Sequence, residues 1–309
     1  MSREEARARQ PYEVFDKRFR FLVQPNAWPE LLFDGLKWAE GPVWFADTGV
    51  LLISDIPNDR ILRWSEGGGV TVHRQPAQHT NGHARDRQGR LVSCSHGARA
   101  VLRTEPDGRI TVLADRYDGK RLNSPNDLVV KSDGTIWFTD PPYGILSDYE
   151  GHKADQEQDG CHVYRLEPDT GDLTVVCDDF VKPNGLAFSP DESKLYVADS
   201  GRSHDADGPH HIRVFDVADG RRLTGGEVFC EVEPAVPDGL RVDTQGNVWT
   251  SAGDGVQCFD SEGTMLGKIL LPRTVANLTF GGPRKNRLFI AATDQVWACY
   301  VATNGVQWP

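Results

Sequence analysis

The most constraining feature of this 309-residue sequence is a unit of an apolar run, a polar turn and a second apolar run. Four of the turns read DTG, DRQG, SDG and DTQG, which are typical of tight connections between strands. Each unit therefore indicates a β-hairpin, and recurrence along the chain indicates a repeat architecture. The six units begin at Gly41, Gly82, Asp127, Gly185, Gly239 and Leu278.

Each hairpin except the last is followed by two further strand-like runs around a tight turn, as in residues 60–74 and 162–179. Four antiparallel strands per unit predict an all-β fold, the six-bladed β-propeller, in which the blades surround a central channel. A β-sandwich with regular hairpins is the alternative. Six units in phase favour the propeller over the sandwich.

The sixth unit is one strand short of a complete blade. We expect the N-terminal segment, residues 1–39, to supply the missing outer strand and so close the ring. The run FRFLVQ, residues 19–24, is the candidate for that strand. Residues 1–309 would then form a single propeller domain.

Composition narrows the classes of partner. Hydrophobic residues make up 39% and charged residues 26%, a balance typical of a chain that buries a core. The net charge of -11 disfavours nucleic acid and anionic membrane surfaces. The charged start MSREEARARQ and the lack of an apolar run of ~18 residues predict neither a secretory signal nor a membrane span, and hence a cytoplasmic protein. The six cysteines are spread singly, and most are expected to be buried free thiols.

An oxygen-bearing side chain stands just before the first strand of every unit. It precedes the turn of its hairpin by eight residues in five units and by nine in the first. Because the first strand of each blade lines the channel, residues in one register should form a ring at one channel mouth. The six residues are Glu40, Asn81, Asn126, Asn184, Asp238 and Asn277.

Carboxylate and amide oxygens without Cys or His are the ligands of a hard cation such as calcium, with magnesium or manganese as alternatives. Asn and Asp also start strands for reasons of turn chemistry alone. A register kept over six units favours the cation site. Two carboxylates in such a ring, Glu40 and Asp238, would also require a counter-ion.

The second strand of each hairpin returns to the same channel mouth. Its last residues include Asp55, expected to be an ordinary turn residue, and His96, expected to be a pocket or structural residue. Asp140 and Asp199 are expected to support the ligands from behind, as are Asn81 and Asn277. Two long polar segments, residues 144–160 and 201–211, are expected to be loops near the site.

Five strings in order along nearly the whole chain resemble the gluconolactonase and regucalcin family, and the bacterial gluconolactonases most. They are EGPVW from Glu40, RLNSPNDL from Arg121, FTDPPYGI from Phe138, PNGLAFSPD from Pro183 and PDGLRVD from Pro237. One position departs from that pattern. Related gluconolactonases often carry an acidic residue before the HG of blade two, where Ser95 stands here.

The resemblance implies a propeller with one catalytic divalent ion held by Glu40, Asn184 and Asp238, with Asn126 completing the metal or substrate site. Calcium is the first expectation, and magnesium, manganese, zinc and ferrous iron are alternatives. The resemblance further implies hydrolysis of a small lactone, such as glucono-1,5-lactone. Asp238 would either take the proton from the attacking water or position that water.

Substrate hydroxyls would be bound by blade-three residues and His96. Arg121 and Asn123 either contact substrate or brace their loop; the other expected contacts are Asn126 and Tyr143. No GxSxG nucleophile motif is present. Two other functions stay open: an esterase or organophosphatase with the same site, and a non-catalytic calcium-binding propeller.

Overall fold

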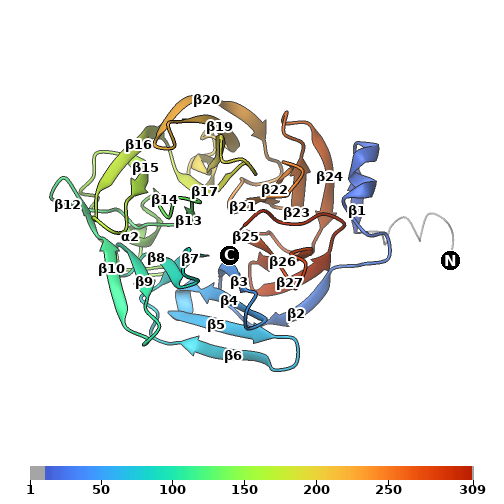
Figure 1. Ribbon diagram of the computed structural model, residues 1–309, viewed down its shortest axis with the longest axis horizontal. Helices are drawn as coiled ribbons and strands as arrows, with labels where there is room; N and C mark the ends of the chain where they lie inside the picture. Colours follow the sequence, from blue (N-terminus) through green and yellow to red (C-terminus); the bar gives the residue numbers. More distant parts are fainter. Residues whose placement is uncertain (1–10, 308–309) are drawn as a thin grey trace.

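Six antiparallel sheets stand around a central channel in the computed structural model, which describes residues 11–307 (Figure 1). The predicted six-bladed β-propeller is confirmed. The blades have four strands in sequential order from the channel outward, with two additions from the N-terminal part of the chain. One N-terminal strand is the outermost strand of blade six, and another adds a fifth strand outside blade five. Residues 1–10 of the predicted N-terminal segment lie outside the described residues.

The first three blades are formed by residues 39–180. Blade one comprises β3 (Ala39–Phe45), β4 (Val50–Asp55), β5 (Arg60–Ser65) and β6 (Gly69–Arg74). Blade two comprises β7 (Thr80–Arg85), β8 (Leu91–Ser95), β9 (Ala100–Thr104) and β10 (Ile110–Ala114). Blade three comprises β13 (Leu128–Val130), β14 (Ile136–Asp140), β15 (Cys161–Leu166) and β16 (Leu173–Phe180). A small hairpin, β11 (Arg116–Tyr117) and β12 (Lys120–Arg121), joins blades two and three.

The last three blades follow the same plan. Blade four comprises β17 (Pro183–Phe188), β18 (Lys194–Asp199), β19 (His211–Ala218) and β20 (Arg222–Glu231). Blade five comprises β21 (Leu240–Val242), β22 (Val248–Ala252), β23 (Gly255–Phe259) and β24 (Met265–Leu270), with β1 (Tyr12–Val14) added outside. Blade six comprises β25 (Asn277–Gly281), β26 (Arg287–Ala292), β27 (Gln295–Tyr300) and β2 (Glu30–Asp34).

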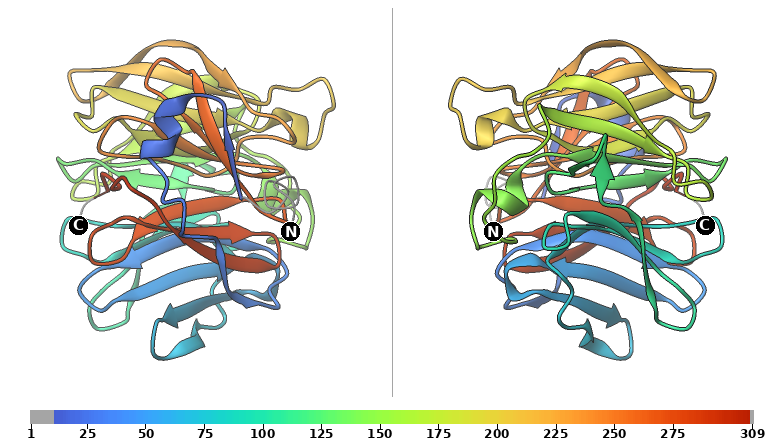
Figure 2. Two further views of the ribbon diagram at one scale, coloured as in Figure 1. Left: turned by 90° about the vertical axis from the view of Figure 1, so that its right-hand side faces the viewer. Right: turned by 90° about the vertical axis from the view of Figure 1, so that its left-hand side faces the viewer.

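Short helices occupy the connections. They are η1 (Lys17–Phe21), η2 (Ile56–Asn58), η3 (Gly201–Ser203) and α2 (Tyr143–Leu146). Figure 2 shows α2 and η3 at the same face of the disc. Within residues 11–307, no helix has the length and apolar character needed to cross a membrane.

The ring is closed by an N-terminal strand, as predicted, but by a different segment. Strand β2 pairs with β27, with Leu31 opposite Trp297. The FRFLVQ run instead lies mainly in η1, where Phe19 is fully buried and its ring centroid lies 6.0 Å from that of Trp249. Its apolar residues therefore pack against the core of blade five. A short apolar run can form either a strand or such a packed helix, and its apolar content alone does not tell the two apart.

The core lies between neighbouring blades. The buried cluster between blades six and one, for example, joins Leu51 and Ile53 of β4 to Phe289 of β26, with Phe33 of β2 packed against it. All six cysteines are free thiols.

The closing strand offers a direct test of ring closure. Phe33 is half-buried against the core, whereas its neighbour Leu31 is 41% exposed. We expect Phe33→Ala to lower the free energy of unfolding by about 2 kcal/mol, roughly half the cost of truncating a fully buried Phe. The matched variant Leu31→Ala should change it by less than about 0.5 kcal/mol. Equal effects in urea unfolding would contradict this packing.

Candidate active site

The six side chains predicted to form a ring do gather at one end of the channel. Asn81 donates to Asn126, Asn126 donates to Asn184, and Asn277 donates to Glu40 with a distance of 2.9 Å between Nδ2 and Oε2. Five members line a cavity of about 310 Å³: Glu40, Asn81, Asn126, Asn184 and Asp238. Asn277 lies behind Glu40 and does not line the cavity.

Glycines explain why the ring is so tight. A glycine follows the ring residue in four blades, and its backbone touches that of the next blade. A Cβ on Gly41 would lie 1.9 Å from the carbonyl oxygen of Asn81, and one on Gly185 would lie 2.2 Å from that of Asp238. No side chain fits there, because such distances are far below van der Waals contact. Where the sequence has Glu-Gly, Asn-Gly or Asp-Gly, the inner strands of neighbouring blades can therefore approach closely. The oxygen-bearing side chain before each glycine is thereby brought near those of the other blades.

The carboxylate of Glu40 carries the strongest sign of a missing partner. Its side chain is 3% exposed, and Oε2 accepts the N–H of Gly41 at 2.6 Å as well as the amide of Asn277. Its other oxygen, Oε1, is buried without a hydrogen-bond partner. An orphaned carboxylate oxygen is costly unless a cation or proton neutralises it.

The second carboxylate, Asp238, shares this electrostatic environment. Burial and the charges of Glu40 and Asp127 raise its pKa well above the ordinary value, and burial and Asp127 likewise raise the pKa of Glu40. Like charges in a low-dielectric site raise each other's pKa, and a bound cation reverses the effect. Two carboxylates and the neighbouring amides thus fit a hard cation. Within residues 11–307, no group of three or more His, Cys, Asp and Glu side chains is arranged to hold one, so amides must complete this donor set.

Three aspartates hold the loops that deliver ring residues. Asp55 accepts the backbone N–H of Lys37 at 2.9 Å, Asp140 that of Asn123 at 2.8 Å, and Asp199 that of Val181 at 3.0 Å. Each bonded N–H lies three residues before a ring residue of the same blade, so the three contacts are equivalent. Asp140 and Asp199 therefore bond the loops that precede ring residues, and Asp55, expected to be an ordinary turn residue, makes the equivalent contact.

Ser95 occupies the equivalent position in blade two. Its hydroxyl donates to the carbonyl of Gln78 at 2.6 Å, three residues before Asn81. Ser95 therefore holds its loop through a backbone carbonyl, and it does not line the cavity.

His96 lies directly behind the ring. Its Nε2 is 3.2 Å from the Asn126 side-chain oxygen and 3.3 Å from the Asn81 side-chain nitrogen, and its Nδ1 is 3.1 Å from the carbonyl oxygen of Glu150. Burial lowers the pKa of His96 to about 4. A neutral imidazole in this place fixes the two amides, and it does not line the cavity.

The blade-three residues expected to contact substrate are divided by the structure. Tyr143 lines the cavity, with its hydroxyl 3.2 Å from that of Ser203. Asn123 is buried and binds the carbonyls of Asp140 and Gly160, and the guanidinium of Arg121 donates to the carbonyl of Ala98. Neither Asn123 nor Arg121 lines the cavity, so their contacts are those of loop braces.

Several cavity residues were not anticipated. The two long loops contribute Tyr149, Glu150 and His204, and burial raises the pKa of Glu150 to about 7. Their polar composition had indicated proximity to the site but no individual residue.

Asp127 was also missed. It is 1% exposed, accepts from Asn277 at 3.3 Å and lies 3.6 Å from Nη1 of Arg241. A signal was present, because Asp127 stands where four other blades have the glycine that follows the ring residue.

Fold and geometry together define a class: six-bladed propellers with a polar site of carboxylates and amides at one mouth of the channel. The chain belongs to the SMP-30/Gluconolactonase/LRE-like family, whose model matches residues 38–294. It is 33% identical to a gluconolactonase of Zymomonas mobilis over 91% of this chain and 83% of that protein. It is 28% identical to a pentonolactonase of Haloferax volcanii over 81% and 80% of the two chains.

A solved structure agrees with this assignment. A gluconolactonase from Xanthomonas campestris superposes with a TM-score of 0.89 at 42% identity, covering 94% of each chain. The predicted family resemblance is confirmed.

Asp140 gives a pH-dependent test of the bracing contacts. Burial raises its pKa to about 7, so between about pH 4 and pH 7 the folded chain keeps a proton that the unfolded chain loses. Wild-type stability should therefore fall as pH rises through this window, by at most about 1.4 kcal/mol per pH unit. Asp140→Asn keeps an acceptor for Asn123 but does not titrate, and should lack this component. Parallel stability curves from pH 4 to pH 8 would contradict the assignment.

Proposed function

We propose that this chain hydrolyses a small lactone at the cavity of the channel mouth, with a divalent cation held by Glu40, Asn126, Asn184 and Asp238. The observation that carries the proposal is the orphaned Glu40 oxygen in a ring of oxygen donors beside an open cavity. The gluconolactonases and the pentonolactonase among its relatives support a sugar lactone, for which we name glucono-1,5-lactone.

When bound, such a cation would polarise the ester carbonyl and make an adjacent water more acidic. We propose calcium first because all four donors are oxygens, and magnesium, manganese, zinc or ferrous iron as alternatives. His96, Asp140 and Asp199 would fix the amides and loops behind these donors. Preorganised ligands cost less to assemble at the moment of binding.

We assign to Asp238 the handling of the proton of the attacking water. Its backbone N–H donates to the Ser251 hydroxyl at 2.8 Å, and the hydroxyl of Ser200 donates to the preceding carbonyl, that of Pro237, at 2.6 Å. These contacts fix the carboxylate at the cavity wall. It would accept the proton of the water or orient the water toward the carbonyl carbon.

The cavity wall supplies partners for sugar hydroxyls. Tyr143 and Ser203 offer hydroxyls, His204 an imidazole and Glu150 a carboxyl group. A polyhydroxylated ring satisfies such groups, whereas an apolar ester leaves them unpaired, at a cost. This composition favours a sugar lactone over an aryl ester or an organophosphate.

One buried serine–histidine pair lies away from the cavity. Ser54 Oγ lies 2.8 Å from Nε2 of His83, which resembles an activated pair, but both residues are fully buried and neither lines the cavity. Burial lowers the pKa of His83 to about 3, so it remains a neutral hydrogen-bonding group.

The cytoplasmic location expected from the sequence stays a prediction.

The proposal predicts metal-dependent turnover that requires Asp238. Metal-stripped protein should hydrolyse glucono-1,5-lactone only after one of the five divalent ions is returned, and Asp238→Asn should lower kcat by about 10²-fold or more. A pH-indicator assay measures the acid released, corrected for spontaneous hydrolysis. Binding of an ion without turnover of any lactone or ester would leave the non-catalytic propeller as the explanation.

A second prediction separates cavity residues from loop braces. Tyr143→Ala should lower kcat/KM by about tenfold, the effect of losing about 1.4 kcal/mol of substrate contact. Arg121→Ala, from the same loop region but outside the cavity, should change kcat/KM by less than about twofold. The opposite ranking would place the substrate against Arg121 and contradict the proposed orientation of the site.

A further inference from the structure

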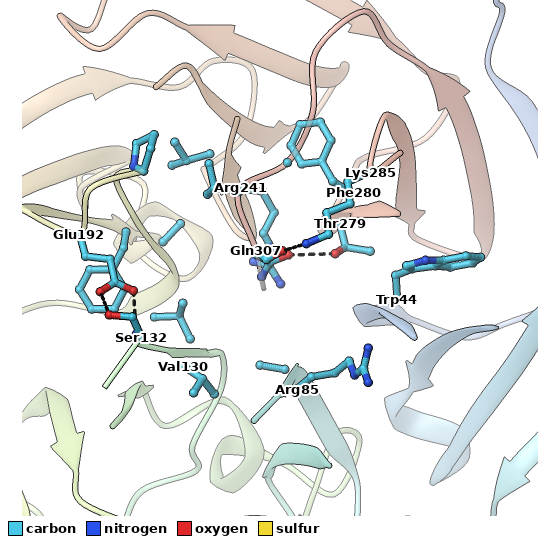
Figure 3. A pocket seen from close by; sticks show the side chains of 18 of the residues that line it. Trp44, Arg85, Val130, Ser132, Glu192, Arg241, Thr279, Phe280, Lys285 and Gln307 are labelled. Atoms are coloured by element: carbon cyan, nitrogen blue, oxygen red, sulfur yellow. Dashed lines mark hydrogen bonds between the residues drawn. The ribbon is translucent and has the colours of Figure 1, made fainter. Parts of the chain in front are cut away.

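A second cavity has a volume of about 430 Å³. Figure 3 shows side chains that line it. It lies at the other end of the channel from the first cavity. Strand β3 runs from one cavity to the other: Glu40 near its start lines the first cavity, and Trp44 near its end lines the second. The turns of the inner hairpins and residues 305–307 complete the wall. Nothing in the proposed lactonase uses this space.

Basic side chains outnumber acidic ones in the wall of this cavity, although the protein has a net charge of -11. Arg85, Arg87, Arg241 and Lys285 contribute to the wall, against two acids, Asp191 and Glu192. Both acids have partners: Asp191 accepts from Ser189 and Ser193. Glu192 accepts from Lys131 and Ser132, and its Oε1 lies 3.8 Å from Nη2 of Arg87.

The cations influence one another. Burial and the charge of Arg85 lower the pKa of Lys285, whose ammonium donates to the carbonyl of Gln307. Positive charges held together away from bulk water attract an anion.

Arg241 is the decisive residue. Its side chain is 1% exposed, and Nη1 donates to the carbonyl of Leu240 at 2.7 Å and lies 3.6 Å from Asp127 Oδ2. Its Nε and Nη2 are buried and have no hydrogen-bond partner. These two nitrogens form one edge of the guanidinium, and their parallel N–H groups match two oxygens of a carboxylate or phosphate.

We propose that this cavity binds a small oxyanion, a carboxylate or phosphate group, on the Nε and Nη2 edge of Arg241. Lys285 and Arg85 add positive charge around it. The site is distinct from the lactonase site, since it lies at the opposite end of the channel and shares none of the proposed cation ligands. Ordered water on the same two nitrogens is the competing occupant.

Isothermal titration calorimetry with inorganic phosphate, repeated with acetate at the same ionic strength, tests the proposal on the full-length protein. We expect one site per chain, and comparison of the two anions shows whether it prefers phosphate or carboxylate. Arg241→Lys keeps a positive charge near Asp127 but lacks the pair of parallel N–H donors. It should weaken binding of the preferred anion by about tenfold or more.

Two matched variants control for charge and for folding. Lys285→Gln should weaken binding several-fold, whereas Arg20→Gln removes the same charge from the exposed outer face and should leave binding unchanged. If Arg241→Lys does not fold, as judged by circular dichroism, the comparison of Lys285→Gln with Arg20→Gln decides whether the anion binds in this cavity.

Asp238→Asn separates this site from the channel mouth, and phosphate or acetate binding should survive it unchanged even if lactone turnover is lost. Anion binding that disappears in Asp238→Asn belongs to the other end of the channel and overturns the proposal. If neither phosphate nor acetate binds the wild-type protein, only water occupies the Arg241 edge, and this result also overturns the proposal.

Discussion

Contact between the backbones of successive blades around the channel is the constraint on which this structure depends. The glycines that follow four ring residues leave no room for a Cβ, and the N–H of Gly185 donates to the carbonyl of Asp238 in the next blade at 3.0 Å. Inner strands held this closely bring their first side chains together. Five blades then present carboxylate and amide oxygens to one small cavity, and Asn277 of blade six supports Glu40 from behind. Burying carboxylates together in this way is costly unless a cation neutralises them.

A chain of polar contacts links the two ends of the channel. Glu40 accepts from Asn277, Asn277 also donates to Asp127, and Asp127 lies beside Arg241. Two buried carboxylates, Glu40 and Asp127, are thus followed by the Arg241 guanidinium, and each end has a group with unfilled hydrogen-bonding capacity. The Glu40 oxygen suits a cation at one mouth, and the Arg241 nitrogens suit an anion at the other. The electrostatics of the propeller axis thus account for both proposals.

Much of this could be predicted from the sequence because a propeller repeats its local signals. The hairpin units indicated six blades, and the register of Glu40 through Asn277 indicated the ring. The closing strand was misplaced because FRFLVQ and ELLFD are both short apolar runs, and only packing against β27 and Trp249 separates their roles. Arg121 and Asn123 stood in a motif, but a motif does not reveal which way a side chain points. Asp127 and Arg241 depend on contacts between blades, which no local pattern reports.

Direct measurement of cation binding tests the central claim, that the ring at the channel mouth is a cation site. Calcium should bind metal-stripped protein with a stoichiometry of one ion per chain in equilibrium dialysis, and Glu40→Gln should abolish or greatly weaken that binding while the fold persists. If no divalent ion binds, or if binding is unchanged in Glu40→Gln, the orphaned carboxylate oxygen has another explanation and the account of the site is wrong.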